Sequence, residues 1–321
     1  MSIRLLTENT RDTKHMRAYY SECIASMIDA GKPVVGMDAD LMRAVGLLPF
    51  KKGREKNIFD CGIAEANMVG VAAGLSAEGF VPFAHSFATF ASRRAYDQTF
   101  MSGAYARLNV KLVGSDPGVA AALNGGTHMA FEDVALMRAV PGMTIVEPSD
   151  PVMLVNILPD IAETYGMFYL RLFRLEAMRI YDDGSEFEIG KAVQLREGSD
   201  AAIIACGLEV YEAIKAADAL AKEGISVRVL DMFTIKPVDR DAILAAARDT
   251  GAIVTAENHN VVGGLGDAVA QVLCEEYPVP MGRVGVCESF GEVGSTPALM
   301  EHFKLTAADI AAEVKRVIAR K

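Results

Sequence analysis

Residues 61–79 read CGIAEANMVGVAAGLSAEG, a run of small and apolar side chains with one carboxylate, Glu65, near its head. The segment Ala64–Ala77 predicts a helix that is apolar almost all round, which belongs inside the molecule or inside an interface. Gly70 and Gly74 lie four residues apart and leave a smooth stripe on which another helix can lie close. Because FVPFA follows, the stretch predicts a helix leading into a buried strand.

The same alternation of helix and strand continues through the first half of the chain. Helical patterns cover Thr13–Ala30, Phe87–Met101, Phe131–Ala139 and Pro151–Glu163. Short apolar strand patterns read VVGMD, FVPFA, NVKLVGS, MTIVE and MFYLRL. Strands that alternate with helices predict right-handed crossovers and a parallel sheet covered on both faces.

The polar stretch YDDGSEFEIGK, Tyr181–Lys191, separates this half from a second series of the same kind. It carries turn residues and offers no face to a core, which is typical of a domain boundary. Beyond it the strand patterns read AAIIAC, VRVLDM, AIVTAE and RVGVCE. The helical patterns cover Val210–Lys222, Arg240–Ala247, Leu265–Glu276 and Ala307–Ile318, the last with a capping-box start at Thr306. The sequence therefore predicts an α/β protein of two doubly wound domains, residues 1–185 and 186–321.

The composition excludes several classes of protein. The chain has 321 residues, of which 51% are hydrophobic and 23% charged, as is ordinary for a globular protein. Its net charge of -10 argues against an electrostatic footprint for nucleic acid or an anionic membrane. No signal-peptide pattern and no run of about 18 apolar residues occurs, so the cytoplasm is the expected location. The five cysteines are scattered without C-x-x-C spacing, and we expect them to be reduced and to bind no metal.

Two interpretations of Glu65 are open from the residues alone. A carboxylate in the first turn of a helix interacts favourably with the amide dipoles, which is worth about 0.3–1 kcal/mol. A carboxyl group desolvated among apolar neighbours instead becomes available as a proton donor at neutral pH. The first interpretation needs no buried surroundings, whereas the second depends on them.

A resemblance to a known family distinguishes these interpretations. GIAEANMVGVAAGL, then FVPFAHSFATFASRRAYDQ, NVKLVGS, GGTHMAFEDVALMRAVPGMTIVEPSD and YLRLFR, resembles in the same order the C-terminal half of transketolase, a thiamine diphosphate enzyme. The similarity runs from about Arg17 to Ile318 and covers the pyrimidine-binding and C-terminal domains. Several motifs in register are far more specific than any single pattern.

The resemblance implies roles around the cofactor. Glu65 would hydrogen-bond a ring nitrogen of the aminopyrimidine and stabilise the imino tautomer that deprotonates the thiazolium carbon. Phe87 and Phe90 would pack on the pyrimidine ring, and Asp40 would lie near the thiazolium. His128, in GGTHMAFED, would contact the two-carbon ketol unit and assist proton transfer. Without the resemblance, the two phenylalanines fit a core-facing helix, Asp40 a turn or N-cap, and His128 a cap or surface site.

The resemblance also implies an anion clamp. Arg17 and Arg174 match the arginines that grip the sugar phosphate, and the planar guanidinium group suits bidentate binding of oxyanions. Surface salt bridging is the alternative interpretation for any arginine. A pair of arginines at matching positions favours the clamp.

Four positions depart from the family pattern. Asp116, in SDPG, stands where transketolases carry the histidine of SHAG, and an acid there would repel a dianion. Asn124, in LNGGTH, replaces the aspartate that recognises the 2-hydroxyl of the donor sugar. Ala44 replaces a phosphate-contacting serine, and His85 replaces a small residue beside the cofactor motif. The altered sugar end predicts the same ketol chemistry on an unusual sugar, with a different anion or a displaced phosphate.

The family's motif for the cofactor diphosphate, Gly-Asp-Gly with a downstream Asn, is absent from the chain. GGLGD near Gly264 is only a partial glycine pattern, and acidic and His residues show no metal-ligand spacing. The resemblance therefore implies the beta half of a split transketolase, whose alpha partner holds the diphosphate and Mg²⁺ in an α2β2 assembly. Neither chain alone would be active. The Gly70/Gly74 helix would lie at an interface, and Gly190–Lys321 would stabilise the assembly without carrying chemistry.

Alternative functions remain at this point. The beta subunit of a 2-oxo acid dehydrogenase shares the fold, the split and the activating glutamate, but GGTHMAFED and the paired arginines argue against it. Deoxyxylulose-phosphate synthase is similar but ordinarily keeps both halves in one chain. A non-catalytic regulatory subunit would explain Asp116 and Asn124 as decay. A nucleotide-binding electron-transfer protein would need the missing glycine fingerprint.

Overall fold

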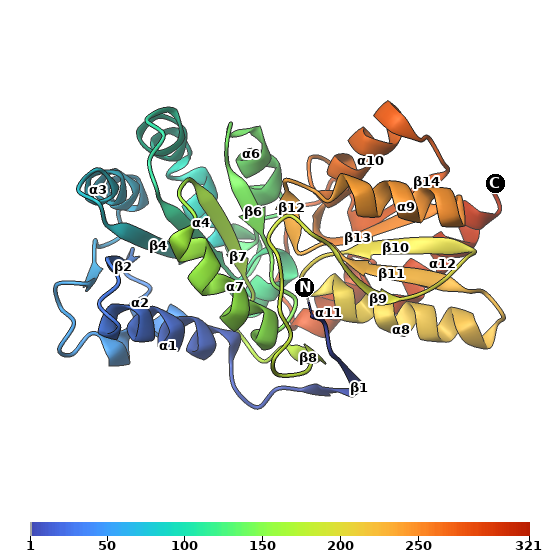
Figure 1. The fold of residues 1–321 in the computed structure, drawn as a ribbon, viewed down its shortest axis with the longest axis horizontal. Coiled ribbons are helices and arrows are strands. Elements are labelled where there is room, and N and C mark those ends of the chain that lie inside the picture. The colour runs from blue at the N-terminus through green and yellow to red at the C-terminus, as the bar shows by residue number, and fades with distance from the viewer. Residues whose placement is uncertain (1) are drawn as a thin grey trace.

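The computed structural model describes residues 2–321 and shows two α/β lobes side by side (Figure 1). The sheet of the first lobe has the strand order β12-β6-β7-β5-β4-β2-β3, and that of the second has β14-β13-β10-β11-β9. A separate two-stranded ribbon pairs β1 (Leu5–Arg11) with β8 (Met178–Tyr181). Most neighbouring strands within the two large sheets are parallel, as the alternation of helix and strand predicts.

Most strands of the first sheet are buried along most of their length, which explains their apolar sequences. Its strands are β2 (Val34–Asp38), β3 (Ile58–Asp60), β4 (Val81–Phe87), β5 (Lys111–Ser115), β6 (Thr144–Val146), β7 (Phe168–Leu172) and β12 (Thr234–Lys236). The longer helices of this lobe are α1 (Met16–Asp29), α3 (Glu65–Ala77), α6 (Asp133–Ala139) and α7 (Pro151–Glu163). Several of them begin a few residues later than predicted.

The second lobe repeats the alternation of strands and helices. Its strands are β9 (Val193–Arg196), β10 (Ala201–Ala205), β11 (Val227–Asp231), β13 (Ile253–Asn260) and β14 (Met281–Val286). Its helices are α8 (Glu209–Lys222), α9 (Arg240–Thr250), α10 (Leu265–Glu276), α11 (Thr296–His302) and α12 (Ala307–Ile318). The capping box predicted at Thr306 is confirmed, with Asp309 as its partner. Within residues 2–321, no helix has the length and apolar character needed to cross a bilayer.

The continuous helix predicted over Phe87–Met101 is wrong. The strand β4 extends to Phe87, because its pairing with β5 continues to the register Phe87↔Ser115. The rest of the segment is divided among α4 (Ala88–Arg93), α5 (Tyr96–Gln98) and a π-helix, η2 (Thr99–Tyr105). Phe87 therefore lies at the end of a strand, and Phe90 lies on the helix that follows it.

Elements too short to show a period escape the sequence patterns. Examples are β3, β12 and α11. The strand β12 belongs to the second half of the chain yet pairs antiparallel with β6 at the edge of the first sheet. Thus one strand of the second series completes the sheet of the first lobe.

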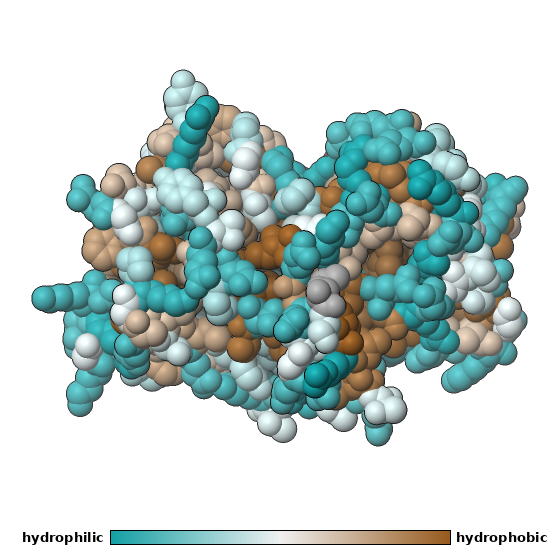
Figure 2. Space-filling model, viewed as in Figure 1, coloured by the Kyte–Doolittle hydropathy of each residue, from teal (hydrophilic) through white to brown (hydrophobic). Residues whose placement is uncertain are grey.

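The two lobes are joined by a buried ionic network. Arg171 on β7 is fully buried; its Nε lies 2.8 Å from Asp133 Oδ2, and its Nη1 lies 2.8 Å from Glu147 Oε1. Its Nη2 also donates to the carbonyl of Asn258 in the second lobe at 2.8 Å. Figure 2 shows apolar residues gathered near the middle of one face, where the lobes meet, with hydrophilic residues around the rim. The hydrogen bond from Arg171 to Asn258 thus ties the second lobe to the strand β7 of the first sheet.

Candidate active site

Four adjacent strands of the first sheet, in the order β7-β5-β4-β2, end at one edge of that sheet. The carboxyl ends of parallel strands are where open α/β sheets place their ligands. The predicted site residues at or just after these ends are Asp40, Phe87, Asp116 and Arg174. Residues far apart in the chain are thus brought to one edge.

Glu65 is the first residue of α3, and only 4% of it is exposed. Its Oε1 accepts a hydrogen bond from Ser86 Oγ at 3.2 Å and one from Arg94 Nη1 at 3.1 Å. No hydrogen bond among residues 2–321 uses Oε2. The carboxylate is buried as the proton-donor interpretation requires, but its surroundings are partly polar and include a cation, which the sequence did not indicate.

The aromatic residues lie against one another beside this carboxylate. The ring centroids of Phe87 and Phe90 are 6.2 Å apart, and the His128 ring lies 5.7 Å from Phe87 and 5.1 Å from Phe90. The Arg94 guanidinium stacks over the Phe90 ring at 3.8 Å. Arg94 therefore connects Glu65 to the cluster of Phe87, Phe90 and His128.

Arg94 is a site residue that sequence reasoning missed. It stands in SRRAYDQ, a segment of the motif that carries the family resemblance, but neither arginine in it was assigned a role. The neighbouring Arg93 pairs instead with Glu132, the residue before α6, at 3.0 Å. In the sequence, the signal for this site is two consecutive arginines after two aromatic residues. Only the structure shows that the two arginines have different partners.

The predicted anion end forms a second cluster. Arg17 Nη1 donates to the carbonyl of Ala44 at 3.0 Å, and the backbone N–H of Arg17 donates to the carbonyl of Arg174 at 3.2 Å. Arg174 Nε lies 2.6 Å from Asp116 Oδ2, and the Arg174 guanidinium lies 5.3 Å from the centroid of Phe87. The structure thus brings Arg17, Ala44, Asp116 and Arg174 together next to the aromatic cluster, whereas Asn124 lies outside this group.

Asp116 does not stand free in this cluster. It is 1% exposed, and burial raises its pKa to about 6, although Arg174, His85 and Arg17 oppose the shift. Its backbone has a φ of 51°, a left-handed conformation that aspartate tolerates better than most residues. The resemblance predicts that Asp116 faces a substrate dianion and repels it. In the structure its carboxylate is instead buried and pairs with Arg174.

His85 cannot contact a substrate directly, which corrects its predicted substrate-binding role. Its side chain is completely buried on β4, and both ring nitrogens are engaged within the chain. Nδ1 lies 2.6 Å from Asp38 Oδ2, and Nε2 lies 2.9 Å from Ser115 Oγ. The physical reason is strand geometry, since His85 sits opposite Asp38 in the β2–β4 ladder. His85 therefore links the carboxyl ends of β2 and β5 through Asp38 and Ser115.

Asp40 and Asn124 are less closely tied to the clusters. Asp40 is exposed with a φ of 64°, and its backbone N–H donates to Asp60 Oδ1 at 3.0 Å. Asn124 is exposed at the end of the 3₁₀ segment η3 (Gly118–Asn124). No hydrogen bond or ion pair in the described part of the chain joins either side chain to Glu65 or Arg174.

The loop that carries Asn124 and His128 is packed against the second lobe. A Cβ atom added at Gly126 would lie 2.1 Å from the carbonyl oxygen of Gly291, and one at Gly125 would lie 2.7 Å from Val293. Backbone atoms of the two lobes thus meet where only glycine fits. The second lobe supports a loop of the candidate site as well as the fold.

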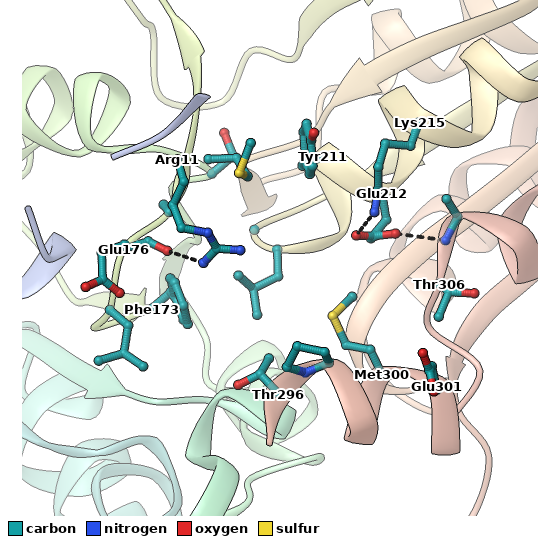
Figure 3. A pocket seen from close by; sticks show the side chains of 18 of the residues that line it. Arg11, Phe173, Glu176, Tyr211, Glu212, Lys215, Thr296, Met300, Glu301 and Thr306 are labelled. Atoms are coloured by element: carbon teal, nitrogen blue, oxygen red, sulfur yellow. Dashed lines mark hydrogen bonds and ion pairs between the residues drawn. The ribbon is translucent and has the colours of Figure 1, made fainter. Parts of the chain in front are cut away.

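A cavity lined by residues of both lobes lies away from these clusters. It has a volume of about 710 Å³ and lies between the lobes (Figure 3). Arg11 and Phe173 face it from one side and Tyr211 and Lys215 of α8 from another, and α11 lines it with Thr296. None of the predicted site residues lines this cavity. No group of three His, Cys, Asp or Glu residues suited to a metal ion occurs within residues 2–321.

Comparison with known proteins identifies the family of the chain. The family model "Transketolase, pyrimidine binding domain" matches residues 12–178, and "Transketolase, C-terminal domain" matches residues 190–310. The chain therefore belongs to the transketolase family and has the domains of its C-terminal half. The predicted resemblance and α/β fold class are confirmed, and the electron-transfer alternative is not supported.

Two relatives and one solved structure match this chain over most of their own length. The 6-deoxy-6-sulfo-D-fructose transketolase subunit of Clostridium sp. (strain MSTE9) is 50% identical over 306 residues, 95% of each chain. One chain of the apulose-4-phosphate transketolase of Phocaeicola vulgatus is 37% identical and covers 90% of this chain and 93% of its own. A solved structure described as a split gene transketolase, inactive beta4 tetramer, superimposes with a TM-score of 0.89 at 41% identity, covering 95% of this chain and 98% of its own.

Proposed function

We propose that this chain is the beta subunit of a thiamine diphosphate-dependent transketolase that moves a two-carbon ketol unit from a modified ketose, with a sulfonated sugar as the foremost candidate, to an aldose. The observation that carries the proposal is the meeting, at one sheet edge, of buried Glu65, the aromatic cluster and the arginines. The relative named for a sulfonated fructose supports the choice of sugar.

The residues present fit the aminopyrimidine end of the cofactor. A carboxylate that is 4% exposed and has one uncommitted oxygen, Oε2, suits a hydrogen bond to a ring nitrogen. The neighbouring faces of Phe87 and Phe90 suit a flat aromatic ring. When bound, thiamine diphosphate supplies the carbon nucleophile that accepts and releases the ketol unit.

The chain's own residues have separate tasks in this proposal. Glu65 holds a proton at the ring nitrogen, in a poorly solvated site where the hydrogen bond is strong. His128 lies beside both aromatic rings, and its Nδ1 is 2.9 Å from Thr127 Oγ1. No hydrogen bond among residues 2–321 uses His128 Nε2, which leaves this atom for a substrate hydroxyl. Arg17 and Arg174 bind the charged tail of the sugar.

The remaining parts of the proposal concern assembly. An alpha subunit supplies the site for the cofactor diphosphate and Mg²⁺, and two copies of each chain form an α2β2 complex. In this proposal the domain boundary falls between residues 185 and 186, and the complex works in the cytoplasm. The split-gene relative was described as inactive as a tetramer of beta chains, which supports dependence on a partner.

The test is reconstitution of the enzyme. The chain is co-expressed with an alpha subunit, and ketol transfer is assayed with thiamine diphosphate and Mg²⁺ over phosphorylated, sulfonated and branched ketoses. We expect transfer by the pair, none by either chain alone, and loss of transfer when the cofactor or metal is withheld. A pair that binds thiamine diphosphate but transfers nothing would favour the regulatory-subunit alternative. Acyl transfer to a lipoyl carrier would favour the dehydrogenase.

A further inference from the structure

We propose that the ion pair between Asp116 and Arg174 sets the charge of the anion subsite, so that the enzyme selects a sugar with a monoanionic sulfonate tail over one with a phosphate dianion. This inference rests on the proposed function. It assigns the choice of substrate to one residue, Asp116, which acts through Arg174 and does not touch the substrate itself.

Only one of the three guanidinium nitrogens of Arg174, Nε, has a side-chain partner among the described residues. Its Nε lies 2.6 Å from Asp116 Oδ2 on the buried side, while 19% of its side chain remains exposed. No hydrogen bond among residues 2–321 uses its terminal nitrogens, Nη1 and Nη2. The guanidinium group therefore presents its outer edge to a ligand while its inner edge is held by a carboxylate. Asp116 is too deeply buried to meet the ligand.

The charges near the tail give the selectivity. Arg17 and Arg174 bring two positive charges, and the ionised Asp116 removes one of them. One net positive charge matches a sulfonate, which is a monoanion throughout the physiological range. A phosphate monoester carries about −1.5 to −2 charges at pH 7, so part of its charge would be left uncompensated in a poorly solvated site.

Two further features agree with a ligand that needs fewer donors. Ala44 offers no hydroxyl group, and one donor of Arg17, Nη1, is already used on the Ala44 carbonyl at 3.0 Å. Behind Asp116, His85 is held between Asp38 and Ser115, so the His85 ring nitrogens are not available to an anion. The subsite therefore depends on the guanidinium groups of Arg17 and Arg174.

The pH dependence of selectivity follows from the same groups. Burial raises the pKa of Asp116 to about 6, while Arg174, His85 and Arg17 face the carboxyl and oppose the shift. Protonation of Asp116 below that pH restores the second positive charge, and the phosphate itself loses charge over the same range. The preference for sulfonate is therefore expected to be strong at pH 8 and to weaken as the pH falls towards 6.

The experiment uses the co-purified subunit pair. The ratio of kcat/KM for 6-deoxy-6-sulfofructose to that for fructose 6-phosphate is measured for the wild type and for Asp116→Asn, which removes the charge at almost constant shape. We expect the ratio to shift at least tenfold towards the phosphate sugar, mainly through KM. Asp116→Glu retains the charge and is expected to retain the preference better. Asp241→Asn removes an equal charge from a side chain that is 90% exposed and serves as the matched control.

An unchanged ratio in active Asp116→Asn would overturn the inference, as would a wild-type preference for the phosphate sugar. Calorimetric titration of the wild-type pair with a short alkyl sulfonate and the matching alkyl phosphate gives a test that needs no variant. Tighter binding of the sulfonate at pH 8 is expected, and the reverse order contradicts the inference. Failure to transfer from either sugar would count against the proposed function, and the titration would still decide the inference.

Discussion

Among single residues, Arg94 is the ionic partner of the Glu65 carboxylate. Arg94 Nη1 lies 3.1 Å from Glu65 Oε1, and the Arg94 guanidinium lies 3.8 Å from the Phe90 centroid. Arg94 therefore contacts both the carboxylate and the Phe90 ring. A buried carboxylate without such a partner would face a desolvation penalty of several kcal/mol. Arg94 therefore positions Glu65 by holding one carboxylate oxygen, Oε1, and leaving Oε2 without a hydrogen bond among the described residues.

Loss of Arg94 is expected to impair the enzyme more than loss of its neighbour. Arg94→Gln in the reconstituted pair should lower kcat/KM by about tenfold, because Glu65 loses an ionic partner and Phe90 loses a stacking partner. Arg93→Gln removes the pair with Glu132 and a hydrogen bond to Thr89, neither of which involves Glu65, and should remain close to wild type. Partial rescue by Arg94→Lys would indicate that charge is the main contribution. Equal effects of the Arg93 and Arg94 substitutions in steady-state kinetics would contradict this assignment.

At the scale of elements, the sequence shows what is periodic and misses what depends on pairing across the sheet. The helix α3 and the start of α12 follow from spacing and capping, and the buried strands follow from short apolar runs. The break after Phe87 does not, because pairing of β4 with β5 overrides the helical pattern. The pairing of Asp116 with Arg174 joins residues that follow different strands, which no local pattern specifies.

The exposed stripe of α3 predicts an interface. Asn67, Gly70, Val71 and Gly74 are exposed or half-buried on one side of this otherwise apolar helix, and nothing lies within 4 Å of a Cβ added at either glycine. Because a side chain fits there in the single chain, Gly74→Leu should fold, with a gain of up to about 1 kcal/mol in helix propensity. We nevertheless expect it to block close packing of a second chain.

The measurement for Gly74→Leu is the mass of the complex in solution, by size exclusion with light scattering, together with its activity. We expect smaller species and loss of ketol transfer. Ala221→Leu places the same side chain on an exposed site of α8 and should assemble normally. A Gly74→Leu complex of wild-type mass and activity would place the interface elsewhere.

For the whole molecule, polar contacts between the lobes are as important as the shared apolar core. Asp231 ends β11 in the second lobe, yet its Oδ2 accepts hydrogen bonds from Ser149 Oγ at 2.5 Å and Tyr181 Oη at 2.7 Å. Both donors belong to the first half of the chain. Burial raises the pKa of Asp231 to about 7, although the hydrogen bonds from Ser149 and Tyr181 lower it.

This shift predicts a pH-dependent stability. An acid whose pKa is higher in the folded than in the unfolded state stabilises the fold at low pH, and that contribution is lost as pH rises from about 4 to about 7. For a shift of about three units the loss amounts to about 4 kcal/mol at most. Asp231→Asn does not titrate, so its Tm should fall less than the wild-type Tm between pH 5 and pH 8. Parallel Tm curves in thermal melts would contradict a raised pKa at Asp231.

The proposed activity of the enzyme depends on proton transfer by Glu65, and steady-state ketol transfer by the subunit pair carrying Glu65→Gln tests this role most directly. Glutamine has the same shape as glutamate and keeps the contacts with Ser86 and Arg94 in part. It cannot hold the ionisable proton. With thiamine diphosphate binding confirmed by calorimetry, we predict a loss of kcat of about 10²–10⁴-fold. Turnover close to wild type in that variant would contradict the account.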